Sequence, residues 1–494
     1  MRLFTLAPWA MLFLSLPAAL WGQEPCGYRG KSEWLTRYQQ HRNQVVQSRG
    51  SDTAWLYVPM TLHIVGSTNS TYLDASQALK AVCEMNERFL PAKMRFFLMP
   101  DDPIRYHFNS EWNDHDWGGG ADMINTNNLP GRMNAYLVNN PAGNCGYYWL
   151  DAIVLNRGCS NSGNTTWAHE AGHFFSLPHP FVGWEGFSWD YSKPAPETID
   201  GTEVERVDRS NCQWASDGFC DTEPDYLTYR WGCTSDFRSG VLQKDPAGTE
   251  FRSDASLYMG YALDACASRF TAEQIDAMRA NYLDERSEYA LTEPVQQNLP
   301  DSFSVQLISP IDTTLVQYND VTLEWKAVPG ASIYTVELSF LSNFGALSFS
   351  KTVVNDTKVV VTRPLPNNRL MYWRVRAVSG WDLCASGQTV QRGVFKTQNL
   401  LATNDLERTL SSELSPNPAS AGLPATLVLN TESSMEALLT LTDASGRQCY
   451  RQVLDIAPGE NFLEIPTAAL ESGLYVVSLQ NEKGVILKRL AVTE

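Results

Sequence analysis

Three of the 7 histidines in this 494-residue chain, His169, His173 and His179, lie close together in the stretch TTWAHEAGHFFSLPHPF. On an α-helix, residues four positions apart are separated by about 6 Å along the axis and about 40° around it, so His169 and His173 can face one point. Zinc in a catalytic site takes three protein ligands and keeps a fourth position for water. His179 can supply the third ligand, and Glu170 stands where it could accept a proton from that water. The spacing therefore predicts a zinc site that performs chemistry.

The pattern formed by these residues resembles HExxHxxGxxH, the zinc-binding motif of the metzincin metalloproteases. The resemblance implies that the three histidines ligate zinc and that Glu170 acts as general base and acid. One position departs from the motif, because Ser176 stands where the family has glycine, at the point where the helix ends. A serine in the left-handed region costs about 1 to 2 kcal/mol relative to glycine. Pro178 also forces Leu177 out of helical dihedrals, so we expect the chain to turn here all the same.

A second motif, SLYMGYALDACASRFTAEQIDAM, carries Met259, 80 residues after His179. Together with NCQWASDGFCDTEPDY before it, this stretch resembles the pappalysin branch of the metzincins, also called the M43 or cytophagalysin family, over roughly residues 54 to 290. The resemblance implies that Met259 supports the site from a tight turn without ligating metal. It also implies that Tyr261 donates a hydrogen bond to the oxyanion of the reaction intermediate. A merely packed tyrosine is the alternative for Tyr261.

Cysteines accompany both motifs, and 7 of the 10 lie between Cys83 and Cys266. Spacing alone does not determine their connectivity. The family resemblance implies two bridges, Cys212 with Cys233 and Cys220 with Cys266. Cys145 and Cys159 could form a third.

Cys26 lies apart from these, in the stretch PCGYRG near the N-terminus. This stretch resembles the Cys-Gly of a cysteine switch, in which a thiolate occupies the fourth position on zinc until its segment is removed. A disulfide, for example with Cys83, is the alternative. Arg42 and Arg49 are candidate processing points between this stretch and the first strand.

The stretch DGFCDTEPD places four acidic side chains close together: Asp217, Asp221, Glu223 and Asp225. The family resemblance implies that a structural calcium ion could bind here. A solvated acidic loop is the alternative.

The elements that must position these residues begin at Ala54. WLYVPMTLHIV, MRFFLMP, RMNAYLVN and DAIVLN read as strands, and DASQALKAVCEMNERFL reads as a helix. This order predicts an α/β domain with a central sheet over residues 54–295. Because 494 residues exceed the size of one compact core, we expect further domains downstream.

From about Asp301 the hydrophobic pattern changes to a period of two, which predicts a β-sandwich over residues 300–398. The placement of Trp325, Tyr334 and YWRVRAV resembles a fibronectin type III module. Residues 399–413 read as a linker, and residues 414–494 as a second β-sandwich. There, LSPNPAS and SGLYVVSLQNEKGVILKRLAVTE resemble the C-terminal sorting domain of type IX secretion in Gram-negative bacteria. That resemblance implies the type IX machinery as a partner, and secretion or attachment to the outer surface.

At the N-terminus, MRLFTLAPWAMLFLSLPAALWGQEP has the pattern of a signal peptide, with a cut between Gly22 and Gln23. Residues 1–22 are therefore predicted to be a signal peptide and residues 23–53 a pro-segment. No later segment approaches a membrane-spanning length. The net charge of −17, with no basic block, argues against nucleic acid and anionic membrane surfaces as partners.

These expectations combine into a multidomain protein, with an α/β metzincin-like zinc protease domain followed by two β-sandwich domains. The predicted function is that of a secreted zinc endopeptidase, made as a latent precursor, that acts on proteins or peptides. The alternative is a surface adhesion or binding protein on a catalytically impaired protease scaffold, for which Ser176 is the only support in the motif.

Overall fold

The computed structural model of the chain describes residues 26–49, 54–68, 73–361, 363–398, 410–481 and 484–493, and of residues 42–49 the backbone only. The predicted signal peptide and most of the predicted linker lie outside these residues, as do the side chains of Arg42 and Arg49. None of the helices described has an apolar run long enough to cross a membrane.

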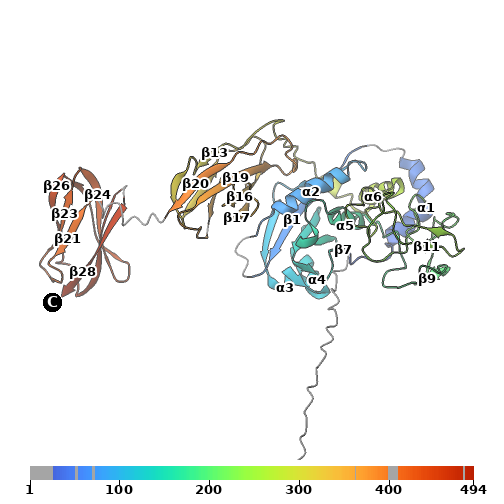
Figure 1. Cartoon of the computed structure of the whole chain (residues 1–494), viewed down its shortest axis with the longest axis horizontal. Coiled ribbons are helices and arrows are strands. Elements are labelled where there is room, and N and C mark those ends of the chain that lie inside the picture. The colour runs from blue at the N-terminus through green and yellow to red at the C-terminus, as the bar shows by residue number, and fades with distance from the viewer. Residues whose placement is uncertain are drawn as a thin grey trace, which may run out of the picture.

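A mixed sheet of six strands forms the centre of the first domain (Figure 1). Its order is β2-β1-β5-β8-β7, and β3 pairs with the same edge of β1 as β2 does, farther along the strand. All pairs are parallel except β7 with β8, so β7 is an antiparallel edge strand. The strands are β1 (Leu56–Gly66), β2 (Met94–Leu98), β3 (Ile104–Phe108), β5 (Met133–Val138), β7 (Gly146–Trp149) and β8 (Ala152–Asn156).

Helices cover both faces of this sheet, as expected for strands that are apolar on both sides. Alternate residues of β1, among them Met60 and Leu62, share one core with α2 (Ser76–Arg88), α5 (Thr166–Phe174) and α6 (Ala272–Glu285). The opposite face packs against α4 (Trp117–Asn127). The short elements are α3 (Ser110–Asn113), β4 (Asp114–His115), β6 (Asn140–Pro141), η1 (Arg157–Cys159), β9 (Thr198–Ile199), β10 (Thr202–Glu203), β11 (Gln243–Lys244), β12 (Glu250–Phe251) and η2 (Tyr289–Leu291).

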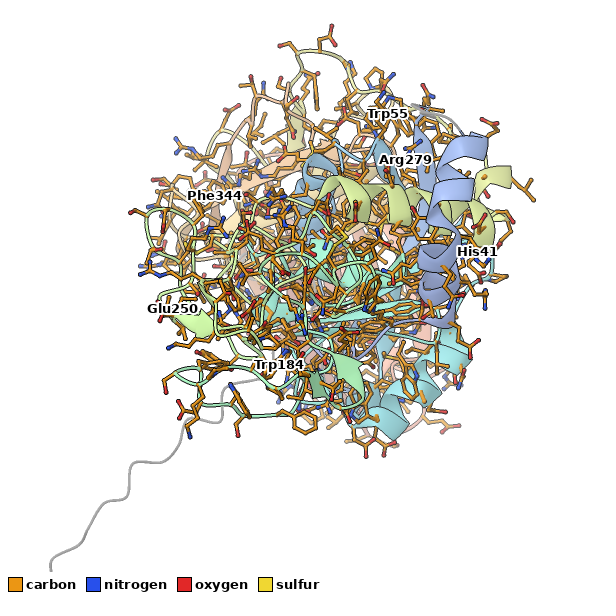
Figure 2. All side chains as sticks on the ribbon, turned by 90° about the vertical axis from the view of Figure 1, so that its right-hand side faces the viewer. His41, Trp55, Trp184, Glu250, Arg279 and Phe344 are labelled. Atoms are coloured by element: carbon orange, nitrogen blue, oxygen red, sulfur yellow. A yellow bond between two sulfur atoms is a disulfide. The ribbon has the colours of Figure 1, made fainter. Side chains whose placement is uncertain are left out.

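The predicted pro-segment contains a helix, α1 (Glu33–Arg49), that packs on this domain. Trp34, Leu35 and Tyr38 are buried in the same core as α5. The indole Nε1 of Trp34 donates to Asp284 on α6 at 3.4 Å. Figure 2 shows α1, where His41 is labelled, beside α6, where Arg279 is labelled. The segment is therefore an integral part of the folded first domain.

A β-sandwich follows, in which a three-stranded and a five-stranded sheet enclose one core. Trp325, Tyr334 and Trp373 are fully buried within it. The smaller sheet contains β13 (Leu307–Ser309), β15 (Val321–Trp325) and β18 (Lys358–Val361). The larger contains β14 (Thr314–Gln317), β16 (Ile333–Ser339), β17 (Phe349–Val354), β19 (Leu370–Val378) and β20 (Gly393–Gln398).

A disulfide between Cys83 on α2 and Cys384 joins this sandwich to the first domain across 301 residues. A backbone hydrogen bond also joins the two domains: the Leu98 N–H donates to the Gly380 carbonyl at 2.8 Å. The Arg95 guanidinium lies 3.9 Å from the ring centroid of Trp381 and donates to its carbonyl. The two domains are thus held together covalently as well as by packing.

The C-terminal β-sandwich has its own core, which includes Leu427, Leu439 and Val477. One sheet contains β21 (Ser411–Ser415), β23 (Ala425–Thr431) and β26 (Gly459–Ile465). The other contains β22 (Ala419–Ser420), β24 (Met435–Asp443), β25 (Gln448–Ile456), β27 (Gly473–Asn481) and β28 (Gly484–Thr493).

Candidate metal centre

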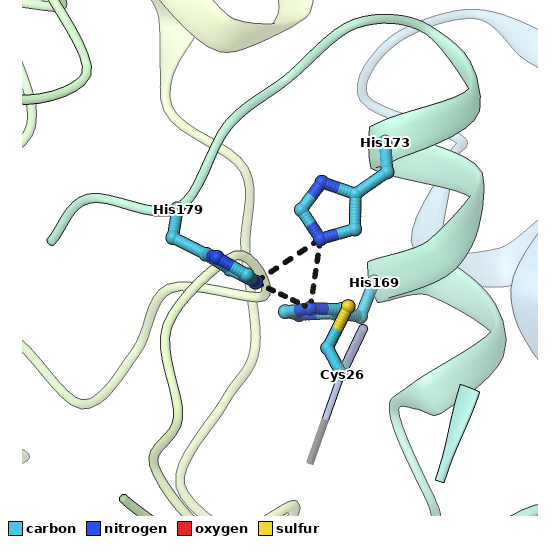
Figure 3. Close-up of side chains that lie close together, drawn as sticks. All are labelled: Cys26, His169, His173 and His179. Carbon is cyan, nitrogen blue, oxygen red and sulfur yellow. Dashed lines mark hydrogen bonds between the residues drawn. The ribbon is translucent and has the colours of Figure 1, made fainter. Parts of the chain in front are cut away.

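Helix α5 and the loop after it bring the three histidines together (Figure 3). The Nε2 atom of His173 lies 3.1 Å from Nε2 of His169 and 3.1 Å from Nε2 of His179. The third Nε2 pair, His169 with His179, is 3.3 Å apart. All three side chains are buried.

The other ring nitrogens of the helical pair fix their protonation. Nδ1 of His169 lies 2.7 Å from the Tyr258 carbonyl, and Nδ1 of His173 lies 2.7 Å from the Leu177 carbonyl. A carbonyl can only accept, so each Nδ1 carries the proton and each Nε2 presents a lone pair. Burial lowers the pKa of His169 to about 4 and the pKa of His173 and His179 well below its usual value. The neutral form that binds metal is therefore favoured.

Two lone pairs that meet at this distance, with a third imidazole nitrogen beside them, form a site suited to a cation. For zinc-nitrogen bonds of about 2.0 to 2.1 Å, a tetrahedral ion separates its ligand atoms by about 3.3 to 3.4 Å. The three distances between Nε2 atoms, 3.1 to 3.3 Å, are close to these separations between ligand atoms. The donor set fits a zinc ion.

Cys26 approaches the same point from the predicted pro-segment (Figure 3). Its Sγ belongs to a group in which all ligand atoms, the three histidine nitrogens included, lie within 4.8 Å of one another. The thiol is buried and free. The alternative of a disulfide with Cys83 is wrong, because Cys83 pairs with Cys384 on the sandwich. A thiol and three imidazoles complete a four-ligand set typical of zinc.

The residues after Cys26 hold it in this position. The Gly27 N–H donates to the carbonyl of Gly146 on the edge strand β7 at 3.1 Å. The ring of Tyr28 stacks on the ring of His173, with centroids 4.2 Å apart. The predicted pro-segment therefore meets the edge strand at Gly27 and covers His173 with Tyr28.

Glu170 is buried beside the three histidines. Its Oε2 lies 3.6 Å from Sγ of Cys26, and its Oε1 has no hydrogen-bond partner among the described residues. Burial raises its pKa to about 8. Gly146 leaves space for the carboxyl group, because a Cβ there would lie 2.7 Å from Oε1. The carboxyl group thus faces the Cys26 thiol.

Ser176 adopts the left-handed conformation expected of the turn after α5, with φ at +67°. Its N–H donates to the His173 carbonyl at 2.8 Å. Nδ2 of Asn281 on α6 donates to its hydroxyl at 3.1 Å, a hydrogen bond that glycine could not accept. The turn is kept, and His179 reaches the other two histidines.

The second motif lies directly beneath and beside the histidines. Met259 is fully buried against Gly172 of α5, where a side chain would collide with the methionine sulfur. The ring of Tyr261 lies 4.9 Å from the ring of His179. Its hydroxyl donates to the Cys26 carbonyl at 3.4 Å.

Two of the predicted disulfides are wrong. The bridges are Cys212 with Cys220 and Cys233 with Cys266, rather than Cys212 with Cys233 and Cys220 with Cys266. The first bridge joins two cysteines that are only 8 residues apart in the sequence. The second lies next to backbone pairing that places Trp231 beside residues 261–263. The bridge between Cys145 and Cys159 is confirmed.

The four acidic residues of the predicted calcium loop do not share one point. Asp221 accepts from the backbone N–H of Glu273, and Glu223 forms an ion pair with Arg238. Asp225 accepts from Ser253. No group of three carboxylates close enough to share an ion occurs here among the described residues. Calcium at Asp217 and Asp221 stays a prediction.

Asp264, which was not singled out from the sequence, connects the second motif to the start of α5. Its Oδ1 accepts from the N–H and the hydroxyl of Thr165 at 2.8 and 2.7 Å. The residues are 99 positions apart, and only tertiary folding brings them together.

The comparisons with known proteins bear mainly on the C-terminal domain. Residues 413–493 match the family described as a secretion system C-terminal sorting domain. This type IX sorting domain indicates export, followed by secretion or attachment to the cell surface, and it suggests the secretion machinery as a partner. The chain has no match among the curated proteins.

Two solved structures show a limited likeness. The FN1–FN3 domains of chicken CNTN1 cover 40% of this chain and 69% of their own, with 13% identity and a TM-score of 0.23. The BSP domain of a biofilm associated protein covers 39% of this chain and 29% of its own, with 15% identity and a TM-score of 0.16. TM-scores this low support no conclusion about fold or function.

Proposed function

We propose that the chain is the latent precursor of a secreted zinc endopeptidase of the pappalysin branch of metzincins. The observation that carries this proposal is the convergence of three Nε2 atoms at 3.1 to 3.3 Å, with the Glu170 carboxyl group buried beside them. His169, His173 and His179 would hold the zinc. Zinc, when bound, lowers the pKa of water toward about 7 and polarises a peptide carbonyl.

The surrounding residues have separate roles in this proposal. Glu170 accepts a proton from the attacking water and delivers it to the leaving amine. The Tyr261 hydroxyl, which donates to the Cys26 carbonyl in the precursor, donates to the substrate carbonyl oxygen. The Gly146 carbonyl on β7 accepts from a substrate N–H, as it does from Gly27, so that an extended peptide adds to the sheet edge.

We further propose that the segment around Cys26 keeps the precursor inactive. Cys26 would take the fourth position on a bound zinc ion, and Tyr28 covers His173. Release requires removal of a segment whose helix α1 is packed into the core of the domain. The sandwich at residues 300–398, with Trp325 and Tyr334 buried on β15 and β16, is proposed to be a fibronectin type III-like module.

Hydrolysis of unfolded protein and of a mixed peptide library tests the function directly. Zinc-loaded protein freed of the pro-segment is compared with a chelated sample and with Glu170→Ala. Activity that is lost in both controls, and that returns when zinc is added to the chelated sample, supports the proposal. Zinc-loaded, folded protein that hydrolyses nothing would favour the adhesion function instead.

Cys26→Ala in the full chain is expected to raise basal hydrolysis at least about tenfold, because alanine cannot occupy the fourth position on the metal. The measurement is initial hydrolysis of a quenched fluorescent peptide before any processing. The control is Cys449→Ala, which removes the other unbridged cysteine, one that is exposed and far from the histidines in sequence. Equal activity of Cys26→Ala and the unchanged precursor would contradict latency through the thiol.

Gly146→Ala is expected to lower activity by about 10- to 100-fold, because its Cβ would displace the Glu170 carboxyl group and small displacements of a catalytic group have large effects on rate. The measurement is kcat/KM together with zinc content, which should not change. Gly240→Ala serves as the control, since nothing lies within 4 Å of a Cβ there. Similar activities for the two variants would argue against this packing.

A further inference from the structure

A pocket of about 190 Å³ lies directly beside the metal centre, bounded by His169 and Tyr261. No residue of the described part of the pro-segment lines it. The Cys145–Cys159 bridge contributes to its wall. A substrate side chain next to the scissile bond can therefore enter it.

Two charged side chains line this pocket, Arg230 and Asp264. Their ion pair joins Nη2 of Arg230 to Oδ2 of Asp264 at 2.9 Å. Asp264 also accepts two hydrogen bonds at Oδ1 from Thr165 and one at Oδ2 from Asn164, at 3.0 Å. Each carboxylate oxygen thus already has two donors, which saturates its acceptor positions.

The backbone holds the two partners in register. Trp231 forms an isolated β-bridge with Ala262. The Trp231 N–H donates to the Tyr261 carbonyl at 3.3 Å, and the Leu263 N–H donates to the Trp231 carbonyl at 2.8 Å. The Cys233–Cys266 disulfide locks the same pairing a few residues farther along. The ion pair is therefore built into the fold rather than formed by two mobile surface side chains.

Arg230 retains the capacity to bind a further group. A guanidinium has five N–H donors, and only Nη2 of Arg230 has a hydrogen-bond partner among the described residues. About a third of the side chain, 37%, is exposed. A carboxylate that enters the pocket can accept from the remaining N–H groups, and charge-assisted hydrogen bonds of this kind are among the strongest in proteins.

We propose that Arg230 determines specificity, so that this pocket selects an acidic substrate side chain beside the scissile bond. The inference rests on the proposed peptidase function and names its substrate class. A lysine or arginine side chain would have to displace Arg230 from Asp264 and would meet a like charge. Removal of Arg230 would release Asp264 and reverse the preference.

The test is cleavage of a peptide library by the full, zinc-loaded chain that carries Cys26→Ala, with cut sites read by mass spectrometry. We expect an acidic residue to be preferred over a basic one by at least about tenfold at one position flanking the cut. Arg230→Ala should move that preference to lysine and arginine at the same position. Arg230→Gln removes the same charge but keeps much of the side-chain bulk. The same shift in preference in this variant would show that the effect does not come from misfolding.

Arg252→Ala, a change at an exposed arginine outside the pocket, is the matched control and should leave the preference unaltered. Two results would overturn the inference but leave the proposed peptidase function intact. One is hydrolysis by the parent with a preference for basic or uncharged residues. The other is a preference that stays the same in both Arg230 variants. Absence of hydrolysis in every variant, including after removal of the pro-segment, would overturn the proposed function, and the inference with it.

Discussion

Glu170→Gln is expected to lower peptide hydrolysis by about 10²- to 10⁴-fold while zinc content stays the same. Glutamine has nearly the shape of glutamate but cannot accept the proton of the attacking water. In the proposed site Glu170 would face the fourth position and would not be needed as a ligand, because the three histidine nitrogens that converge nearby would hold the metal. The measurements are kcat/KM with a fluorogenic peptide and zinc per chain by atomic absorption.

Glu111→Gln provides the matched control, since this glutamate lies exposed on α3. Its activity should equal that of the parent. If Glu170→Gln lost its zinc, the loss of activity would report on metal binding instead. If it kept both its zinc and its activity, the role of Glu170 as base would be untenable.

Removal of the bridge between the first domain and its sandwich is expected to have the largest effect on stability. Cys83→Ala combined with Cys384→Ala opens a loop of 301 residues, and native disulfides typically contribute about 2 to 4 kcal/mol to the free energy of unfolding. We expect a lower midpoint of thermal unfolding by calorimetry, with the zinc content preserved.

Cys449→Ala again serves as the control, because this thiol is exposed and unbridged. An unchanged midpoint in the double variant would mean that the hydrogen bonds at Leu98 and the contact of Arg95 with Trp381 suffice to hold the domains together.

Local spacing predicted the core of the site well. His169 and His173 converge because one helix carries them four residues apart, and His179 follows because the chain must turn before Pro178. The left-handed Ser176 was also expected, but not the hydrogen bond from Asn281 that accompanies it, which is 105 residues away. The alternating strands after Asp301 likewise predicted the sandwich.

Features that depend on packing between distant parts of the chain could not be predicted from the sequence. Pairing Cys212 with Cys233 followed a family resemblance, whereas the actual bridges depend on how residues 231–233 align with the second motif. Cys384 had no predicted partner, because no pattern shows which surface of the sandwich faces α2. The contact of Asp264 with Arg230 joins two loops that only the finished fold brings together.

The bridge between Cys83 and Cys384 also sets an order of events during synthesis. The other three bridges span 14, 8 and 33 residues and can close soon after their own segments emerge. Cys83 must wait until the sandwich is made, since its partner lies 301 residues later. A protein shortened at the end of the first domain would carry an unpaired thiol on α2, open to cross-linking with a second copy. The closed bridge therefore forms only in a chain in which both the first domain and the sandwich have been completed.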